Sequence, residues 1–300
     1  MPKGAVWESL SQPISRSRGR APPTPAVTLP RMNPSLPAIL LASALAIAAL
    51  LAVTAMIARR QDKYALIDVT WGLLFVAVSW VGVVMAGATA RSLVLAALVT
   101  VWGGRLALHL ARRIRGMGED PRYVKILSGA PVGKKFGYAV RRVFLVQGVI
   151  AWFVSLPLQV AAWTSTTHEA HRVVSGVGWI GVALVVAGLI FESVGDAQLA
   201  AFKADPANRG RLMDRGLWAW TRHPNYFGDA VVWWGFWLMA LQVNPGWATV
   251  LSPIAMTFLL VKVSGVALLE KSMSQRPGWA EYAARTSAFV PRPPRRAASR

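Results

Sequence analysis

The chain contains no cysteine among its 300 residues. That absence excludes disulfide bonds, catalysis by a thiolate, and zinc or iron–sulfur sites built on cysteine. Histidine is also scarce, with 4 residues, of which two lie close together in His168-Glu169-Ala170-His171. This pair lacks the i,i+4 spacing of a helical metal site and a third ligand. We therefore predict that the chain holds no metal.

Acidic residues are few: 13 Asp and Glu stand against 33 Lys and Arg, for a formal net charge of +20. In a soluble protein such an excess indicates binding to nucleic acid. Here only 15% of residues are charged and 54% are apolar, and the mean hydropathy is +0.42. This balance is typical of a polytopic membrane protein. We therefore predict an all-α membrane protein without a nucleic-acid partner, whose basic residues mark topology.

Apolar runs are long enough to support this prediction. A helix needs about 20 residues to cross ~30 Å of hydrocarbon. The runs that meet or approach this length predict seven spans, at 36–58, 65–87, 93–110, 143–163, 173–191, 230–243 and 248–269. Arg105 and His109 weaken the third span, and the sixth is short unless the aromatic stretch before it extends it. The predicted membrane domain covers residues 36–291.

Two basic tails flank this domain. Residues 1–35 are rich in Pro, Ser and Arg and contain no apolar run long enough for a signal peptide, so we predict that they are disordered. Residues 292–300 form the second tail. The first tail carries five Lys and Arg before Met32, which becomes important for the predicted topology.

Lys and Arg alternate between the connections. The connections 58–64, 111–142 and 193–228 carry three, nine and five of them, and the tail after Glu270 carries seven, whereas the other connections carry one, one and none. The positive-inside rule predicts a cytoplasmic C-terminus and an N-terminus outside. The five basic residues before Met32 conflict with an outside N-terminus. We therefore predict that translation starts at Met32.

Ionisable residues near the ends of the spans all fall towards the predicted cytoplasmic side. Such residues are costly in lipid and usually face the interior of a bundle, where they mark a site. Their convergence predicts a pocket that opens to the cytoplasm. The residues are Asp68, Arg105, His109, Glu192, Asp196, Asp229 and Glu270.

The connection after residue 191 suits an anionic ligand. Arg binds phosphate through paired N–H groups, and Asn and Asp can hold ribose hydroxyls or an amide. No G-x-G-x-x-G follows a predicted strand and no G-x-x-x-x-G-K occurs, so a nucleotide would need a pocket of another kind. The residues concerned are Lys203, Asp205, Asn208, Arg209, Arg211, Asp214 and Arg215. A topological role alone is predicted for Arg112, Arg113, Lys134 and Lys135.

One stretch contains more candidate functional side chains than any other. Arg215 to Gly235 reads RGLWAWTRHPNYFGDAVVWWG and lies at the mouth of an apolar run. Together with the segment 196–211 it resembles the C-terminal domain of steroid 5-alpha reductases, and more closely their bacterial relatives of unassigned function. The resemblance extends over roughly 36–294, and its other motifs are Asp68-Val69-Thr70-Trp71-Gly72, Gly118 to Tyr123, and Leu268-Leu269-Glu270-Lys271.

The resemblance implies a seven-helix reductase of the bacterial inner membrane that binds NADPH from the cytosol. It implies hydride transfer to a conjugated C=C bond of a lipophilic substrate from the bilayer, such as a steroid or an enoyl or isoprenoid lipid. By position, the cofactor contacts would be Arg105, Glu192, Asp196, Lys203, Arg211, Asn225, Asp229, Trp233 and Glu270. Nothing in the sequence predicts an oligomeric state.

The residues that would polarise the substrate differ from those of the steroid reductases. Those enzymes use a Gln-Glu pair on the second helix and a Tyr on the third. Here Asp68 lies where the acid would be, and Trp102 replaces the Tyr. A Trp N–H can donate a hydrogen bond but cannot transfer a proton as a phenol can. The predicted catalytic residues are Asp68, Trp102 and Tyr226, and the further candidate proton donors are Tyr64, Tyr123 and His223.

A second resemblance is the alternative. Arg222-His223-Pro224-x-Tyr226-x-Gly228, followed by Glu270, is similar to isoprenylcysteine and phospholipid methyltransferases, in which this pattern binds S-adenosylmethionine. Asn225, Asp229 and the segment 196–211 favour the reductase. A transporter is the least favoured reading, because the sequence has no inverted repeat or broken central helix.

Overall fold

The structure is a computed structural model that describes residues 34–167, 174–242, 244–263 and 265–294. The chain divides into two units, Met1–Arg31 and Met32–Arg300, and the described residues all belong to the second. Most of the predicted disordered tail, the start at Met32, the histidine pair at 168–171 and the end of the C-terminal tail lie outside the described residues.

The described residues form helices joined by short connections, with no strand among them and one isolated bridge, Thr221 to Ser287. This confirms the predicted all-α class. The longer helices are α1 (Leu36–Gln61), α2 (Leu66–Ala86), α3 (Ala90–Ile114), α6 (Leu145–Val154), α7 (Leu156–Thr167), α8 (Gly176–Ala204) and α10 (Pro224–Leu241). The shorter ones are α4 (Pro121–Leu127), α5 (Lys135–Ala139), α9 (Leu217–Trp220), α11 (Leu251–Phe258), α12 (Val266–Met273) and α13 (Trp279–Arg285). Single 3₁₀ turns lie at Pro206–Asn208 and Gly246–Val250, and π-helical turns at Val140–Phe144 and Leu259–Val263.

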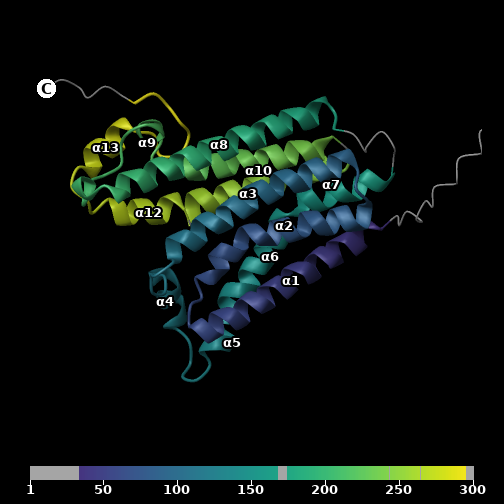
Figure 1. Cartoon of the computed structure of the whole chain (residues 1–300), viewed down its shortest axis with the longest axis horizontal. Helices are drawn as coiled ribbons and strands as arrows, with labels where there is room; N and C mark the ends of the chain where they lie inside the picture. The colour runs from purple at the N-terminus through teal and green to yellow at the C-terminus, as the bar shows by residue number, and fades with distance from the viewer. Residues whose placement is uncertain (1–33, 168–173, 243, 264, 295–300) are drawn as a thin grey trace, which may run out of the picture. The chain divides into compact units, whose positions relative to one another are not determined.

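Six segments of the described residues are long and apolar enough to span a membrane: Leu36–Gln61, Leu66–Ala86, Ala90–Ile114, Lys135–Val154, Gly176–Ala204 and Gly246–Met273. The polytopic membrane protein is therefore confirmed, but the count of seven spans is not reached. The predicted span 230–243 lies in α10, whose first turns carry Pro224, Asn225 and Asp229 and lower its hydropathy. α10 nevertheless runs beside α8 along its length (Figure 1).

The predicted span 143–163 is interrupted, because α6 and α7 are separate helices. Ser155 stands between them with ψ at 0°. Pro157 has no N–H to donate to the carbonyl of Phe153, and its ring crowds the preceding turn, so a continuous helix cannot form there. The Ser155 hydroxyl instead donates to the carbonyl of Trp152 at 2.8 Å. The predicted single span is corrected to a helix with a break before the proline.

α8 is longer than the predicted span 173–191. Its 29 residues extend about 43 Å, which exceeds the ~30 Å of bilayer hydrocarbon. α8 is therefore longer than the apolar layer is thick, and its polar residues lie in its last turns. Glu192, Asp196 and Lys203 lie on this one rigid helix, although the sequence predicts a loop after residue 191.

Glycines set the distance between α8 and α10. Gly181 and Gly188 of α8 face Gly235 and Gly228 of α10, and a Cβ added to Gly228 would lie 2.6 Å from the carbonyl oxygen of Gly188. Small residues at such spacings let helix backbones approach closely in a membrane. The close antiparallel pairing places the acidic C-terminal half of α8 beside the first turns of α10.

Aromatic side chains join α2, α3 and α10. Trp102 of α3 and Trp233 of α10 are fully buried and meet edge to face, with ring centroids 5.5 Å apart. Phe75 of α2 packs on Trp233 with centroids 4.6 Å apart. Edge-to-face pairs of this kind add to the stabilisation that burial provides. The cluster fixes how far α3 stands from the α8–α10 pair.

The loops richest in Lys and Arg gather at one end of the unit. α4, α5, α9 and α13 lie there together with the C-terminal ends of α1, α3 and α8, at the left of Figure 1. This agrees with the predicted alternation of basic connections. The side of the membrane that this end faces stays a prediction.

Candidate functional site

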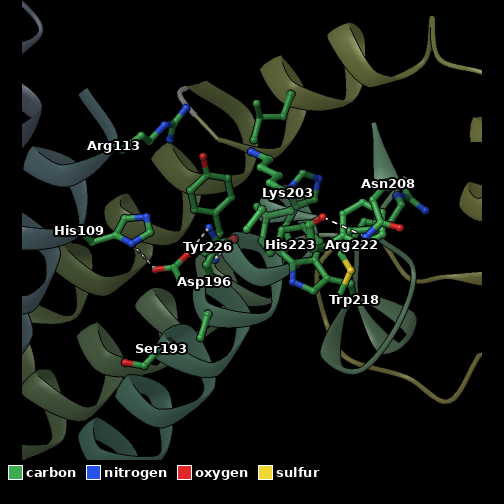
Figure 2. A pocket seen from close by; sticks show the side chains of 18 of the residues that line it. His109, Arg113, Ser193, Asp196, Lys203, Asn208, Trp218, Arg222, His223 and Tyr226 are labelled. Atoms are coloured by element: carbon green, nitrogen blue, oxygen red, sulfur yellow. Dashed lines mark hydrogen bonds and ion pairs between the residues drawn. The ribbon is translucent and has the colours of Figure 1, made fainter. Parts of the chain in front are cut away.

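A cavity of about 1450 Å³ opens at this basic end. The C-terminal halves of α3 and α8, the first turn of α10, and the segments 205–213 and 269–282 line it. Figure 2 shows side chains from these elements converging on the space between them. The structure brings six of the predicted site residues to this cavity: Arg105, Asp196, Lys203, Arg211, Asn225 and Tyr226.

The inner end of the cavity holds a cluster centred on Arg105. Its guanidinium Nη1 lies 2.7 Å from Oε1 of Glu192, and Nη2 donates to Asp196. Asn225 Nδ2 donates to the other oxygen of Asp196 at 3.2 Å. His109 lies one turn after Arg105, with Nδ1 3.8 Å from Asp196 (Figure 2). α3, α8 and α10 each contribute to this cluster.

Two carboxylates of the inner end keep one oxygen without a hydrogen-bond partner in the described part of the chain. They are Oδ1 of Asp229 and Oε2 of Glu192, both buried. Together with Asp196 they oppose the single guanidinium of Arg105. A buried polar oxygen without a partner is costly. Neither carboxylate lines the cavity, however, so the polar side chains that a ligand meets at the inner end are those of Asp196 and Asn225.

The outer part of the cavity is basic. Eight Lys and Arg line the cavity against two Asp. Six of these cations form no ion pair with any described residue: Arg112, Arg113, Lys203, Arg209, Arg211 and Arg276. Lys203 of α8 lies close enough to Arg113 of α3 and to Arg276 for their charges to repel one another. Like charges held together in this way attract an anion.

Arg112 and Arg113, for which the sequence predicts a topological role alone, also line the cavity. They follow Arg105 by seven and eight residues, two turns of α3, and so lie on its face. This spacing is the sequence signal that identifies them as cavity residues. Lys135, in contrast, lies outside the cavity and pairs with Asp62 at 2.6 Å.

An aromatic wall, absent from the predicted site residues, closes the side of the cavity away from α3. Trp218 Nε1 donates to the carbonyl of Gly195 at 2.9 Å, and Tyr282 Oη donates to the carbonyl of Trp218 at 2.7 Å. Trp279 completes the wall beneath the guanidinium of Arg222, 5.4 Å from its ring centroid. These residues come from two segments that are distant in sequence, α9 and α13, so no local pattern predicts that they meet.

Glu270 does not line the cavity but supports its wall. Its Oε1 lies 2.8 Å from Nε and 2.7 Å from Nη2 of Arg222. Arg222 Nη1 also donates to the carbonyls of Ala283 and Thr286, at 3.0 and 2.5 Å. Arg222 therefore ties the start of α10 to α12 and α13. The sequence predicts that Glu270 contacts the cofactor, but in the structure its carboxylate forms an ion pair with Arg222 and lies outside the cavity.

His223 is a poor proton donor at neutral pH. Burial lowers the pKa of its imidazole to about 4, although Glu270, 3.4 Å away, acts in the opposite direction. The imidazole is therefore neutral at pH 7. It stacks on the ring of Tyr226, with centroids 5.8 Å apart and 14° between the planes. This stacking orients Tyr226, whose hydroxyl has no hydrogen-bond partner among the described residues.

Comparison with known proteins places the chain in a family. Residues 54–286 match the family described as Protein of unknown function (DUF1295). The chain belongs to the DUF1295 family. It is similar to the uncharacterized protein C594.04c of Schizosaccharomyces pombe, with 25% identity over 174 residues, which are 50% of this chain and 48% of that protein. The match thus spans about half of that relative. No solved structure matches.

Six predicted residues of this DUF1295 chain do not line the cavity: Asp68, Trp102, Glu192, Asp229, Trp233 and Glu270. Trp102 and Trp233 are fully buried in the aromatic cluster that joins α3 to α10. Neither lines the cavity. Trp102 therefore packs where a tyrosine of the steroid reductases would be expected to act. Of the three predicted catalytic residues, only Tyr226 lines the cavity.

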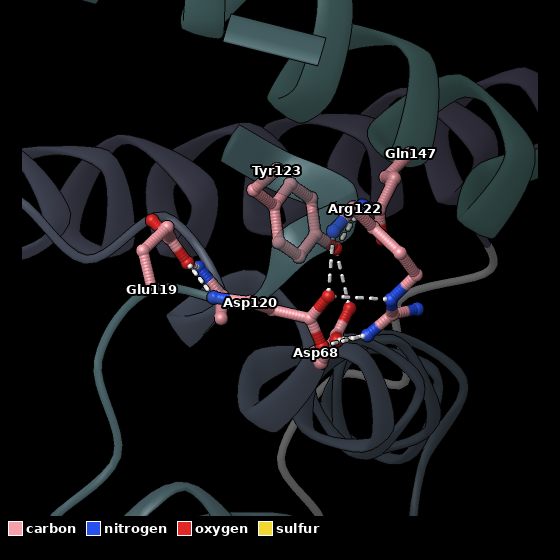
Figure 3. A network of polar contacts seen from close by, with 7 residues as sticks. Asp68, Glu119, Asp120, Arg122, Tyr123 and Gln147 are labelled. Carbon is pink, nitrogen blue, oxygen red and sulfur yellow. Dashed lines mark hydrogen bonds and ion pairs between the residues drawn. The ribbon is translucent and has the colours of Figure 1, made fainter. Parts of the chain in front are cut away.

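Asp68 belongs to a separate polar network of this DUF1295 chain (Figure 3). Its two oxygens accept hydrogen bonds from Tyr123 Oη at 2.5 Å and from Arg122 Nη2 at 2.6 Å. Gln147 donates to Tyr123 Oη at 3.2 Å. Burial, reinforced by the charge of Asp68, raises the pKa of Tyr123 well above its usual range. Asp68 and Tyr123 do not line the cavity.

The same region caps α2. The Glu119 carboxylate accepts hydrogen bonds from the backbone N–H of Tyr64 and, at 3.0 Å, from that of Ala65. These are N–H groups that the first turn of a helix leaves without partners. Tyr64 itself is buried and outside the cavity. The network therefore fastens α4 and the segment before it to the start of α2.

Proposed function

We propose that this DUF1295 protein is a membrane reductase that binds NADPH in the cavity and reduces a conjugated C=C bond of a lipophilic substrate. The observation that carries the proposal is the division of charge along the cavity. The carboxylate of Asp196 and the amide of Asn225 line the inner end, and six cations without an ion pair in the described chain line the outer part. NADPH has the same division, with a carboxamide at one end and phosphates along the rest.

Each part of the cavity suits one part of this cofactor. Asn225 and Asp196 can hold the carboxamide, and Lys203, Arg113 and Arg276 can bind the pyrophosphate. The volume of about 1450 Å³ exceeds the about 300–1000 Å³ of an ordinary small-molecule pocket, which leaves room for a second reactant.

The chemistry requires one proton from the protein. NADPH, held by the residues named above, would supply a hydride to the β-carbon of the C=C–C=O group and leave as NADP⁺. Tyr226 lines the cavity with its hydroxyl free of described partners, and we assign to it the proton that reaches the α-carbon. His223 holds the ring of Tyr226 in place by stacking.

S-adenosylmethionine fits this cavity less well. It carries a sulfonium and an ammonium cation, and its one carboxylate is its only anion, so it offers the outer cations far less counter-charge than the phosphates of NADPH. Arg222 and Glu270, which the methyltransferase pattern contains, are occupied by each other at 2.7 Å. These observations favour the reductase over the alternative.

NADPH should stabilise the purified protein against thermal unfolding, and S-adenosylmethionine should not. A ligand that binds only the folded state stabilises it by about 2.7 kcal/mol at a hundredfold excess over its Kd. The measurement is the unfolding midpoint by tryptophan fluorescence in detergent, with each ligand added separately. A midpoint that rises with S-adenosylmethionine alone would overturn the reductase.

Arg211→Ala should weaken NADPH by roughly 10- to 100-fold and NADH less. A hydrogen bond to a charged group contributes about 1.5–3 kcal/mol, and only NADPH has the 2′-phosphate that we assign to Arg211. Titration of the midpoint shift with both cofactors gives the two Kd values. Arg60→Ala is the matched control, because Arg60 is an exposed arginine at the end of α1. Equal losses for NADPH and NADH would remove Arg211 from the 2′-phosphate site.

A further inference from the structure

The cavity has a lateral arm between α3 and α8 that reaches the outer face of the bundle. Val101 and Leu108 line it and are 56% and 59% exposed, which places them on the surface that faces lipid. From α8, the residues at the i, i+4 and i+7 spacing of one helix face are small, whereas Leu199 and Phe202 line the cavity from other faces. The residues that line the arm are Thr100, Val101, Gly104 and Leu108 of α3 and Ser193, Ala197 and Ala200 of α8.

The arm extends to the depth of the hydrocarbon. Thr100 precedes Arg112 by twelve residues of α3, a rise of about 18 Å. Arg112 lies with the unpaired cations at the basic end, whereas Thr100 is near the middle of a helix long enough to span the membrane. Figure 2 shows Ser193 a turn away from Asp196, below the polar cluster. The arm therefore leads from the inner cluster sideways into the bilayer.

Gly104 faces empty space in this arm. A Cβ added to it meets nothing within 4 Å, whereas a Cβ on the neighbouring Gly103 would lie 2.5 Å from the carbonyl oxygen of Gly72. Glycine inside a helix costs about 1 kcal/mol relative to alanine. Helix packing accounts for Gly103, but no contact in the described structure accounts for Gly104. Because Gly104 has no side chain, the space in front of it stays open.

The arm suits a hydrocarbon chain. No charged residue lies among the seven that form it. The Thr100 hydroxyl is satisfied, since it donates to the carbonyl of Ala96 at 2.6 Å and accepts from Trp80 Nε1 at 3.0 Å. An apolar crevice at this depth gains free energy when apolar groups fill it. A headgroup or a peptide would bring polar groups that the arm cannot pair.

We propose that this arm binds the hydrocarbon chain of the substrate, a membrane-dissolved lipid that enters sideways between α3 and α8. The reactive head then lies at the inner end of the arm, beside Asn225 and Tyr226. The identity of the head rests on the proposed reductase function. The chain site does not, because it depends only on the shape and polarity of the arm.

The experiment is photo-crosslinking in lipid nanodiscs with a sixteen-carbon fatty acid that carries a mid-chain diazirine. Mass spectrometry of the peptides should show labelling concentrated in residues 100–108 and 193–200, and excess unlabelled fatty acid should suppress it. Gly104→Trp should reduce this labelling about tenfold, the loss expected when the ring takes the space of about two methylenes of the chain. A Cβ at Gly104 meets open space, so the first atom of the new side chain is accommodated, and the unfolding midpoint of the variant without ligand checks that it folds.

Val84→Trp is the matched control, since Val84 is 77% exposed on α2 and does not line the cavity. It should leave the labelling unchanged. Labelling spread evenly over α1, α2 and α3, or unaffected by Gly104→Trp, would overturn the chain site. The NADPH midpoint shift is measured on the same variants. If NADPH still shifts the midpoint but the arm is not labelled, only the hydrocarbon-chain site is contradicted. If the arm is labelled but NADPH causes no midpoint shift, only the reductase function is contradicted.

Discussion

Arg105→Leu should lower the stability of the protein by about 3 kcal/mol and the unfolding midpoint by about 6–12 °C. Glu192 and Asp196, both buried, depend on this guanidinium for their ion pairs. Removing one partner of a buried pair leaves the other charge without compensation, which costs about 3–5 kcal/mol. The lower end applies because the Arg105 side chain is 21% exposed. The measurement is thermal unfolding in detergent at pH 7.

A second substitution tests the cause of that loss. Glu192→Gln in the Arg105→Leu background should recover part of the stability, because it removes one of the two uncompensated charges. Glu281→Gln, at an exposed position of α13, should recover nothing. If Arg105→Leu unfolds at the midpoint of the unchanged protein, the carboxylates do not need the guanidinium and the inner cluster is wrongly assigned.

The sequence predicts the membrane helices where length and hydropathy decide them. The spans at 36–58, 65–87 and 93–110 lie within α1, α2 and α3 or match them to within a residue. It fails where a single residue interrupts or extends a helix. Pro157 divides one predicted span. The polar residues Glu192 and Asp196 do not end α8, because their side chains face neighbouring helices rather than lipid.

The inner cluster could be predicted because ionisable side chains cost free energy in lipid and therefore face the interior of the helix bundle. Arg105, Glu192, Asp196 and Asn225 meet as the convergence of ionisable residues on one side implies. The position of an ionisable residue near the end of a span does not by itself predict whether its side chain faces the cavity or another polar network, however. Asp68 lies at a similar end of its helix and turns to Tyr123 and Arg122 instead of to the cavity.

The walls of the cavity could not be predicted, since they depend on long-range packing. Trp218 and Tyr282 are 64 residues apart in sequence and meet through a hydrogen bond from the Tyr282 hydroxyl. The spacing of the glycines, in contrast, is a signal that the sequence does hold. Gly181 and Gly188 repeat at seven residues, as do Gly228 and Gly235, and these are the contact points of α8 and α10.

Gly188→Ala should destabilise the protein by about 2–3 kcal/mol and abolish the midpoint shift with NADPH. The added Cβ would lie 2.6 Å from the carbonyl oxygen of Gly228 and 2.8 Å from the backbone nitrogen of Val232, so α8 and α10 must move apart. Overpacking of this kind costs about 1–3 kcal/mol, and backbone atoms cannot yield as a side chain can. Separation of the helices also moves Asp196 away from Asn225, which disrupts the inner end of the cavity.

Gly104→Ala provides a control of opposite sign. Alanine is favoured over glycine inside a helix by about 1 kcal/mol, and at Gly104 the added methyl group meets open space. The unfolding midpoint should therefore stay the same or rise for Gly104→Ala and fall for Gly188→Ala. Because both positions lie inside long helices, the difference between the two variants isolates the contact between α8 and α10. Equal midpoints for the two variants would mean that the glycines do not set this distance, and the site would then need another support.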